Sequence, residues 1–138
     1  SMKYSNLVVM KVIKKSDILV IAMSDSKKMV KALPNNRFTL SCFYHNDKKP
    51  SMIVDRNNNR FYCFSCKKGG NVISLFQQVY NLNFLASLET LACTFNVKLP
   101  KRSYNETNYE IVEKLNVIKN SYEYKELIQK SYIKTLKK

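Results

Sequence analysis

Apolar positions follow two kinds of pattern along the chain, an alternating one in the middle and a helical one on either side. Apolar and polar residues alternate over 37–42, as they do in half-buried strands. We expect one strand over 37–42 and then a hairpin, whose strands at 51–55 and 60–64 are joined by an asparagine-rich turn at 56–59. A small antiparallel sheet is therefore predicted for the middle of the chain.

A helix is predicted upstream of this sheet, over residues 16–32. It begins with Ser16 and Asp17, which suit an N-cap and an acidic first turn, and it ends ahead of Pro34. Residues 18–21 also have the composition of a strand, so that alternative stays open for this stretch.

Two further helices are predicted downstream of the hairpin. The glycines at 69–70 are expected to need a positive φ, because they follow directly on a tight turn. Asn71 is a suitable N-cap for a helix that ends near residue 81, and a second helix covers 85–95 before a short segment at 97–100. The apolar stripes of both helices are expected to pack on the hairpin.

The chain then continues through a polar linker at 101–108 into one or two helices between 109 and 138. The apolar residues of this last region fall on one side: Ile111, Leu115, Ile118, Tyr122 and Leu127. If this side does not fold back on the rest of the chain, it needs a partner to cover it.

Composition limits the class of protein. The chain has 138 residues, of which 45% are apolar, with two glycines and three prolines; this suits one domain with a small core and excludes a repetitive fibre. The longest apolar run, at 18–23, is far shorter than the roughly 20 residues of a transmembrane helix. Because the run at 7–10 is also too short for a secretory signal, we expect a soluble, cytoplasmic protein with no membrane partner.

The net charge of +14, from 24 basic and 10 acidic residues, is spread along the chain. A small basic domain of this kind is most simply a binder of polyanions, with nucleic acid first and an anionic membrane surface second. The plain alternative is a lysine-rich surface without a specific partner.

Residues of the metal-binding types stand in two short pairs, Cys42-x2-His45 and Cys63-x2-Cys66, with 17 residues between them. A two-residue spacing lets both side chains of one turn reach the same tetrahedral ion, and two such turns complete four ligands. A spacer of this length also suits a hairpin. We therefore predict one structural zinc ion (Zn2+) held by these four residues. A disulfide framework is the weaker alternative, since cytosolic thiols stay reduced.

The remaining cysteine, Cys93, lies in an apolar helical stretch with no ligand-type residue beside it. A small buried thiol is the favoured interpretation, ahead of a metal or redox role.

Three segments carry a resemblance to a known family. They read Cys-Phe-Tyr-His-Asn-Asp-Lys-Lys-Pro-Ser at 42–51, Phe-Tyr-Cys-Phe-Ser-Cys at 61–66 and Gly-Gly-Asn-Val-Ile-Ser-Leu-Phe at 69–76. These segments resemble the N-terminal zinc-binding domain of bacterial DnaG-type DNA primases, and the likeness extends over residues 7–100. The chain departs from the family's pattern, without losing a predicted ligand, at Phe43, Asp47, Ser65 and Lys67.

Together with the predicted elements, the resemblance indicates an α+β fold: a small zinc-ribbon-like antiparallel sheet with packed helices and a helical C-terminal extension. We expect an N-terminal segment at 1–15, in which Ser1 is a tag remnant. A primase-type zinc-binding domain follows at 16–100, and a helical extension or linker to a further domain or partner at 101–138. The source is expected to be bacterial, or a phage or mobile element.

The resemblance also implies a function in DNA replication. In such primases the zinc domain binds the single-stranded DNA template, while a separate catalytic core with DNA-directed RNA polymerase activity makes the RNA primer. Two-metal phosphoryl transfer needs clustered carboxylates, and the acidic residues here are scattered. We therefore expect no catalytic residue in this chain, which acts with a primase catalytic core or a separate polymerase, and beside a replicative helicase.

The expected DNA contacts surround the hairpin. Basic side chains follow phosphates, and exposed aromatic rings stack on unpaired bases. Alternation along 60–64 places Phe61 on one face, with Tyr62 and Phe64 around the opposite face and the metal, and we expect Tyr62 to be the exposed ring. The predicted nucleic-acid-binding residues are Lys48, Lys49, Arg56, Arg60, Tyr62, Lys67 and Lys68.

The alternative function is a zinc-scaffolded adaptor that binds a replicative polymerase or helicase through the helices at 109–138. A shortened chain ending at Pro100 separates the two hypotheses. The adaptor would lose its partner, whereas the DNA-binding module would keep its affinity for DNA.

Overall fold

The computed structural model describes residues 4–46, 48–100 and 105–136. Asp47 and the first half of the linker predicted at 101–108 lie outside the described residues. The strands are β1 Lys31–Leu33, β2 Arg37–Leu40, β3 Met52–Asp55, β4 Arg60–Cys63 and β5 Gly69–Asn71. The helices are α1 Asn6–Lys15, α2 Ile18–Met23, α3 Val72–Tyr80, α4 Phe84–Thr94, α5 Tyr109–Lys119 and α6 Tyr122–Leu136.

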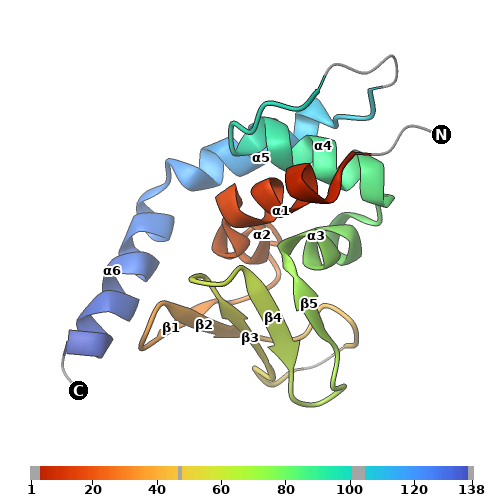
Figure 1. Ribbon diagram of the computed structural model, residues 1–138. Coiled ribbons are helices and arrows are strands. Elements are labelled where there is room, and N and C mark those ends of the chain that lie inside the picture. The colour runs from red at the N-terminus through yellow and green to blue at the C-terminus, as the bar shows by residue number, and fades with distance from the viewer. Residues whose placement is uncertain (1–3, 47, 101–104, 137–138) are drawn as a thin grey trace.

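The strands form one antiparallel sheet in the order β1-β2-β3-β4-β5, so that each strand pairs with the next along the chain. The helices α1 to α5 gather over the sheet and α6 lies beside β1 (Figure 1). The α+β, zinc-ribbon-like fold predicted from the pattern is therefore confirmed, as is the hairpin formed by β3 and β4. No helix in the described part of the chain is long and apolar enough to span a membrane.

The core lies between the sheet and the helices. One row of buried side chains crosses the sheet through Phe38, Val54 and Phe61, and the next crosses it through Leu40, Met52 and Cys63. Nearly the whole of α2 is buried against this face. Because the strand residues between these rows point the other way, the opposite face of the sheet keeps its own, more polar set of side chains.

The helix predicted over 16–32 is too long, because the structure has a helix of only six residues there. Asp17 does cap a helix, accepting a bond from the Leu19 amide at 3.1 Å, but that helix is the short α2. It ends where the Ser24 hydroxyl donates to the Ile21 carbonyl at 2.7 Å. The residues beyond it include β1, which pairs with β2. Ser16 ends the preceding helix α1 by donating to Val12.

The positive φ predicted for Gly69 and Gly70 is also wrong, because both glycines lie extended in β5. Gly69 is instead needed for close packing. A Cβ atom there would lie 2.9 Å from the Phe61 carbonyl and 3.0 Å from the Tyr62 ring. The left-handed residue of this turn is Lys67, with φ 63°.

The predicted downstream helices are confirmed. The Asn71 side chain caps α3 by accepting from the Ser74 amide at 3.0 Å, and α4 covers the third predicted helix. Cys93, expected to be buried, is exposed. It lies between Ala92 and Thr94, which α4 turns toward the core, so a neighbouring position faces solvent even in an apolar stretch.

The two C-terminal helices fold back on the domain. Leu115 of α5 is fully buried, and Ile118 and Leu127 pack against the core. Tyr122, predicted to share this apolar side, is exposed. Tyr124 takes the inward position instead.

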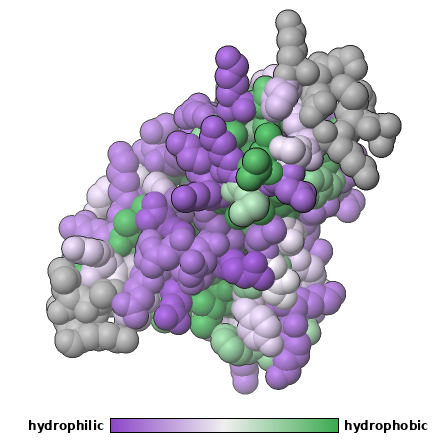
Figure 2. Space-filling model, viewed as in Figure 1, coloured by the Kyte–Doolittle hydropathy of each residue, from purple (hydrophilic) through white to green (hydrophobic). Residues whose placement is uncertain are grey.

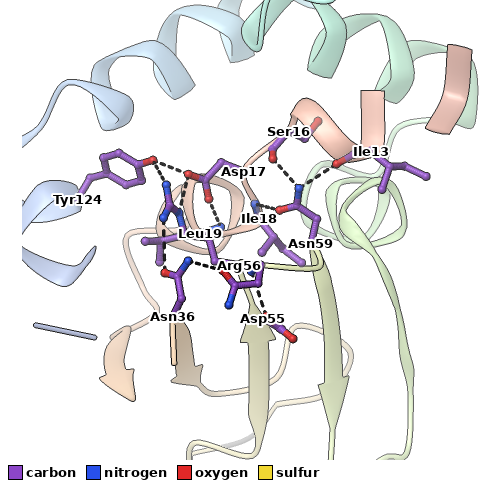
Figure 3. A network of polar contacts seen from close by, with 11 residues as sticks. Ile13, Ser16, Asp17, Ile18, Leu19, Asn36, Asp55, Arg56, Asn59 and Tyr124 are labelled. Carbon is purple, nitrogen blue, oxygen red and sulfur yellow. Dashed lines mark hydrogen bonds and ion pairs between the residues drawn. The ribbon is translucent and has the colours of Figure 1, made fainter. Parts of the chain in front are cut away.

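A polar network ties the β3–β4 turn to the helices (Figure 3). The Asn59 amide accepts from the Ile18 backbone at 2.9 Å and donates to the Ile13 and Ser16 carbonyls at 2.8 and 2.6 Å. Beside it, Arg56 Nε donates to Asp17 at 2.9 Å, and the Tyr124 hydroxyl donates to the same carboxylate. These contacts join three regions that are far apart in the sequence.

Candidate metal centre and open sheet face

The four predicted metal ligands come together at one end of the sheet. Cys42 follows β2 and Cys63 ends β4, and both strands flank β3. His45 and Cys66 lie in the turns that follow each cysteine. The donor atoms of all four residues lie within 4.8 Å of one another, and this is the one group of three or more His, Cys, Asp or Glu donors within the described residues.

Backbone geometry directs N–H groups at two of the sulfur atoms. The Tyr44 amide donates to Cys42 Sγ at 3.2 Å, and the Cys66 amide donates to Cys63 Sγ at 3.5 Å. The second turn is closed by bonds of 2.8 Å from the Lys67 amide to the Cys63 carbonyl and from the Cys63 amide to the Lys68 carbonyl. Amide groups that donate to sulfur, as those of Tyr44 and Cys66 do here, stabilise the thiolate form of a cysteine and orient it as a metal ligand.

The sulfur atoms differ in their electrostatic environment. Burial raises the pKa of Cys42 to about 11, with the nearby Cys63 thiol adding to the shift and the Tyr44 amide opposing it. Burial also disfavours the Cys63 thiolate, but hydrogen bonds from the Cys66 amide and the Ser51 hydroxyl outweigh it and lower the pKa to about 6. A cation between these thiols would favour the charged form of both.

The donor set fits zinc. Cys42 Sγ and Cys66 Sγ lie 3.8 Å apart, which matches the edge of a tetrahedron built with zinc–sulfur bonds of about 2.3 Å. None of the four cysteines forms a disulfide. Three sulfurs and one imidazole are a common ligand set of structural zinc sites.

The sheet face turned away from the core carries aromatic and basic side chains. The residues of this face alternate along each strand with the buried ones. Arg37, Asp55 and Arg60 are cross-strand neighbours in one row, and Ile53 and Tyr62 are neighbours in the next row. We call this surface the open sheet face; with the adjoining Phe64 and Gly69 it borders a shallow cavity of about 290 Å3.

Two aromatic rings stand on the open sheet face. Tyr62 is 40% exposed and Phe64 is 60% exposed, whereas Phe61 is buried. The Tyr62 and Phe64 rings meet edge to face, with centroids 5.1 Å apart. Each exposed ring presents apolar surface to a ligand, and the edge-to-face contact favours this arrangement of the two rings.

The predicted nucleic-acid-binding residues are distributed over four places. Arg60 and Tyr62 lie on the open sheet face, as expected from alternation. Lys67 and Lys68 are exposed in the second cysteine turn, with Lys68 Nζ 4.9 Å from the centre of the Tyr44 ring. Arg56 lies instead at the other end of the hairpin, in the network with Asp17 and Tyr124.

The other two predicted lysines, Lys48 and Lys49, are exposed in the loop before β3. Arg37 and Phe64 are not among the predicted contacts. Arg37 precedes the inward-facing Phe38 in an alternating strand, so the same alternation that placed Tyr62 could have placed Arg37 beside it. Phe64 lies on the same face as Tyr62, as alternation predicted, and its ring is the more exposed of the two.

Comparison with known proteins places this arrangement in a family. The CHC2 zinc finger family matches residues 4–108. A DNA primase from Buchnera aphidicola is 33% identical over 81 residues, which cover 59% of this chain and 14% of that protein. The DNA primase of Staphylococcus epidermidis is 28% identical over 132 residues, covering 89% of this chain and 21% of that protein. The chain thus spans about a fifth or less of the length of these relatives.

Solved structures agree on the fold. The crystal structure of the Aquifex aeolicus primase, which contains zinc-binding and RNA polymerase domains, matches 89% of this chain and 32% of its own, with a TM-score of 0.58 and 18% identity. The family match and the Cys-His-Cys-Cys cluster together show one structural zinc ion. Since the match extends from Tyr4 to Asn108, across the sheet and helices α1 to α4, the chain belongs to the CHC2 zinc finger family, the zinc ribbon of DnaG.

Proposed function

We propose that this chain binds single-stranded DNA template as the zinc-binding module of a DNA primase, supporting RNA primer synthesis during replication. The observation that carries the proposal is the open sheet face. It places the exposed Tyr62 and Phe64 rings beside the cations Arg37 and Arg60. Stacking of bases on aromatic rings, combined with cations that follow the backbone, is the usual mode of single-strand binding.

Zinc has a structural part in this proposal. Cys63 ends the strand that carries Tyr62, and Phe64 lies in the following cysteine turn. The four ligands Cys42, His45, Cys63 and Cys66 would therefore fix the position of both rings. Three thiolates and a neutral imidazole leave the zinc site with a net negative charge, so the attraction for DNA has to come from the surrounding lysines and arginines.

Catalysis is assigned to another part of the primase. Within the described residues no group of three or more acidic, His or Cys donors exists besides the zinc cluster, and two-metal phosphoryl transfer requires clustered carboxylates. The primase catalytic core, or a separate polymerase, would supply them. The combination of zinc-binding and RNA polymerase domains in the Aquifex protein supports this division. Contact with a replicative helicase is a further expectation of the same proposal.

Four of the five apolar side chains behind the adaptor alternative are packed in this chain, and Tyr122 is the one that is exposed. The alternative rested on apolar residues of the C-terminal helices that would need a partner, and Leu115, Ile118 and Leu127 are packed against the core of this same chain.

Fluorescence anisotropy with a short unstructured oligonucleotide, at several salt concentrations, tests the proposal. If three or four phosphates are neutralised, log K should fall with log salt at a slope of about −2 to −3. Arg60→Ala should flatten the slope by less than about one unit. Tyr62→Ala should lower affinity by about 1–3 kcal/mol at every salt concentration, because stacking releases few counterions.

Tyr109→Ala is the matched control, since Tyr109 is an exposed tyrosine at the start of α5. It should leave DNA binding unchanged. Affinity that is indifferent to salt, or that falls equally in the Tyr62 and Tyr109 variants, would show that the open sheet face is not the binding surface.

A further inference from the structure

A second cluster of cations lies at the other end of the hairpin, around a cavity of about 490 Å3. Lys14 and Lys15 reach it from the end of α1, Arg56 from the β3–β4 turn and Lys119 from the end of α5. Asp17 is the one carboxylate among the residues that line it. The lining therefore carries an excess of three positive charges, which repel one another in the absence of an anion.

Arg56 is held in place at this cavity. Its Nε donates to Asp17 at 2.9 Å, one terminal nitrogen donates to Asn36 at 3.5 Å and the other to Tyr124 at 3.2 Å. A guanidinium has five N–H groups, so two remain to donate to a ligand. A fixed fork of this kind loses little conformational entropy when it binds an anion.

The lysines differ in how far they are engaged. Lys119 Nζ donates to the Thr94 carbonyl at 2.7 Å and lies over the Phe95 ring, so it contributes charge from a fixed position. Lys14 and Lys15 are exposed in the last turn of α1. Cations stabilise the carbonyl end of a helix, which accounts for Lys14 and Lys15 on α1 and for Lys119 on α5. It does not account for the convergence of these three lysines with Arg56 around one cavity.

We propose that this cavity binds an anion with several adjacent phosphoryl groups. An excess of several positive charges matches a chain of phosphates better than it matches a single carboxylate, and lysine and arginine are the side chains that bind phosphate. The volume lies within the range of small-molecule sites. Hydrophilic side chains cover much of the visible face of the molecule (Figure 2). The cavity lining is polar apart from the rings of Phe95 and Tyr124, which argues against an apolar ligand.

Two sources supply this ligand chemistry: a free nucleoside triphosphate, and consecutive phosphates of a nucleic acid strand. The proposal does not rest on DNA binding by the open sheet face, because the cavity is built from the β3–β4 turn and from residues of α1, α5 and α6, and shares no lining residue with that face.

The test is a calorimetric titration of the full, zinc-loaded chain with inorganic triphosphate. The double variant Lys14→Ala/Lys15→Ala should bind triphosphate about tenfold more weakly than the unaltered protein. The matched control is Lys98→Ala/Lys125→Ala, which removes the same charge from exposed positions outside the cavity, and it should bind normally. Lys14→Gln/Lys15→Gln repeats the test with residues of good helix propensity. Triphosphate should also raise the melting temperature of the unaltered protein and of the control, and at the same concentration it should raise that of the two cavity variants by less.

Competition with a short single-stranded oligonucleotide distinguishes the two sources. If the oligonucleotide displaces triphosphate and binds more weakly to the cavity variants, the cavity takes strand phosphates. If it binds those variants normally, the cavity takes a free polyphosphate. Tyr62→Ala should leave triphosphate binding unchanged in either case, so failure of the DNA proposal and failure of this one are distinct. Absence of triphosphate binding, or equal weakening in the cavity and control variants, would overturn the inference.

Discussion

The two ends of the β3–β4 hairpin are stabilised by different kinds of interaction. At one end, Cys63 and its three partners converge on a metal site within 4.8 Å. At the other end, Asn59 and Arg56 are held by hydrogen bonds and one ion pair to α1, α2 and α6. The metal end gains its stability from a few strong bonds to an ion, whereas the turn end gains it from many weaker bonds whose net value is about 1 kcal/mol each.

This difference predicts two kinds of failure. Loss of one zinc ligand should unfold the whole metal end, because the three remaining ligands leave one coordination position of the ion without a protein ligand. Loss of one bond at the turn end should lower stability in proportion to the groups left unsatisfied. The following variants test that contrast, from the largest effect to the smallest.

Removal of zinc should have the largest effect. Treatment with a chelator, or Cys63→Ser, should increase amide hydrogen exchange first in the two cysteine turns and then throughout residues 37–70, because metal binding and folding are coupled in so small a unit. Elemental analysis should find one zinc per chain in the unaltered protein. Cys93→Ser is the control, since Cys93 is exposed on α4, and it should keep full zinc content. Full occupancy in Cys63→Ser would contradict the assigned ligand set.

Asn59→Ala should cost about 3 kcal/mol in the free energy of unfolding, because the Ile18 amide and the Ile13 and Ser16 carbonyls lose their partner in a buried site. Zinc content should be unchanged. Denaturant unfolding measures the difference. Asn59 has a φ of 50°, so Asn59→Gly, which removes the backbone strain of the alanine variant, should still lose most of this stability.

The exposed neighbour Asn58 provides the matched control at the turn end. Its side chain donates to Asp55 at the surface, and Asn58→Ala should cost no more than about 0.5 kcal/mol. Equal losses at positions 58 and 59 would mean that the turn is stabilised by its local geometry and not by its bonds to the helices.

Tyr124→Phe should lower the free energy of unfolding by less than Asn59→Ala does, by about 1.5 kcal/mol at neutral pH, since it removes a hydrogen bond to a charged group. The effect should depend on pH. Burial and the nearby Asp17 carboxylate raise the pKa of Tyr124 to about 12 from its ordinary value of 10, with Arg56 opposing the shift. The folded protein therefore binds the Tyr124 hydroxyl proton more tightly than the unfolded chain does. The contribution of this hydroxyl to stability is fully present below pH 10.

As the pH rises from 10 through 12, this contribution should be lost. The difference in unfolding free energy between the unaltered protein and Tyr124→Phe should then shrink. A difference that stays constant over this range would show that the Tyr124 hydroxyl is not bonded to Asp17 in solution.

The same contrast explains which features could be predicted from the sequence. Each ligand pair of the zinc site, the turn of the hairpin and the Asn71 cap depend on residues within a few positions of one another, and their spacing shows in the chain. Tyr124 and Asp17 are 107 positions apart, and no periodicity pairs them. For the same reason Arg56 was predicted as a DNA contact together with the other basic residues, although its guanidinium donates to Asp17 and Tyr124.

The region around α2 was misassigned for a different reason. Residues 18–22 are buried on every side, so they show no amphipathic period that would mark where a helix ends. The end of α2 is set by the Ser24 hydroxyl and by the pairing of β1 with β2. The last of these is a tertiary contact, which overrides the local helical pattern.

The position of α6 beside β1 has a consequence for association between molecules. An edge strand offers unpaired backbone groups to which a strand of another chain can add, and this is a route to aggregation. Here β1 is an edge of the sheet, and the Ser131 hydroxyl of α6 donates to the Leu33 carbonyl on it. At the other edge, β5 is only three residues long and consists of Gly69, Gly70 and Asn71. Both edge strands of the sheet are therefore poor templates for an added strand. Many copies of this basic chain can then bind side by side on a polyanion without polymerising through their sheets.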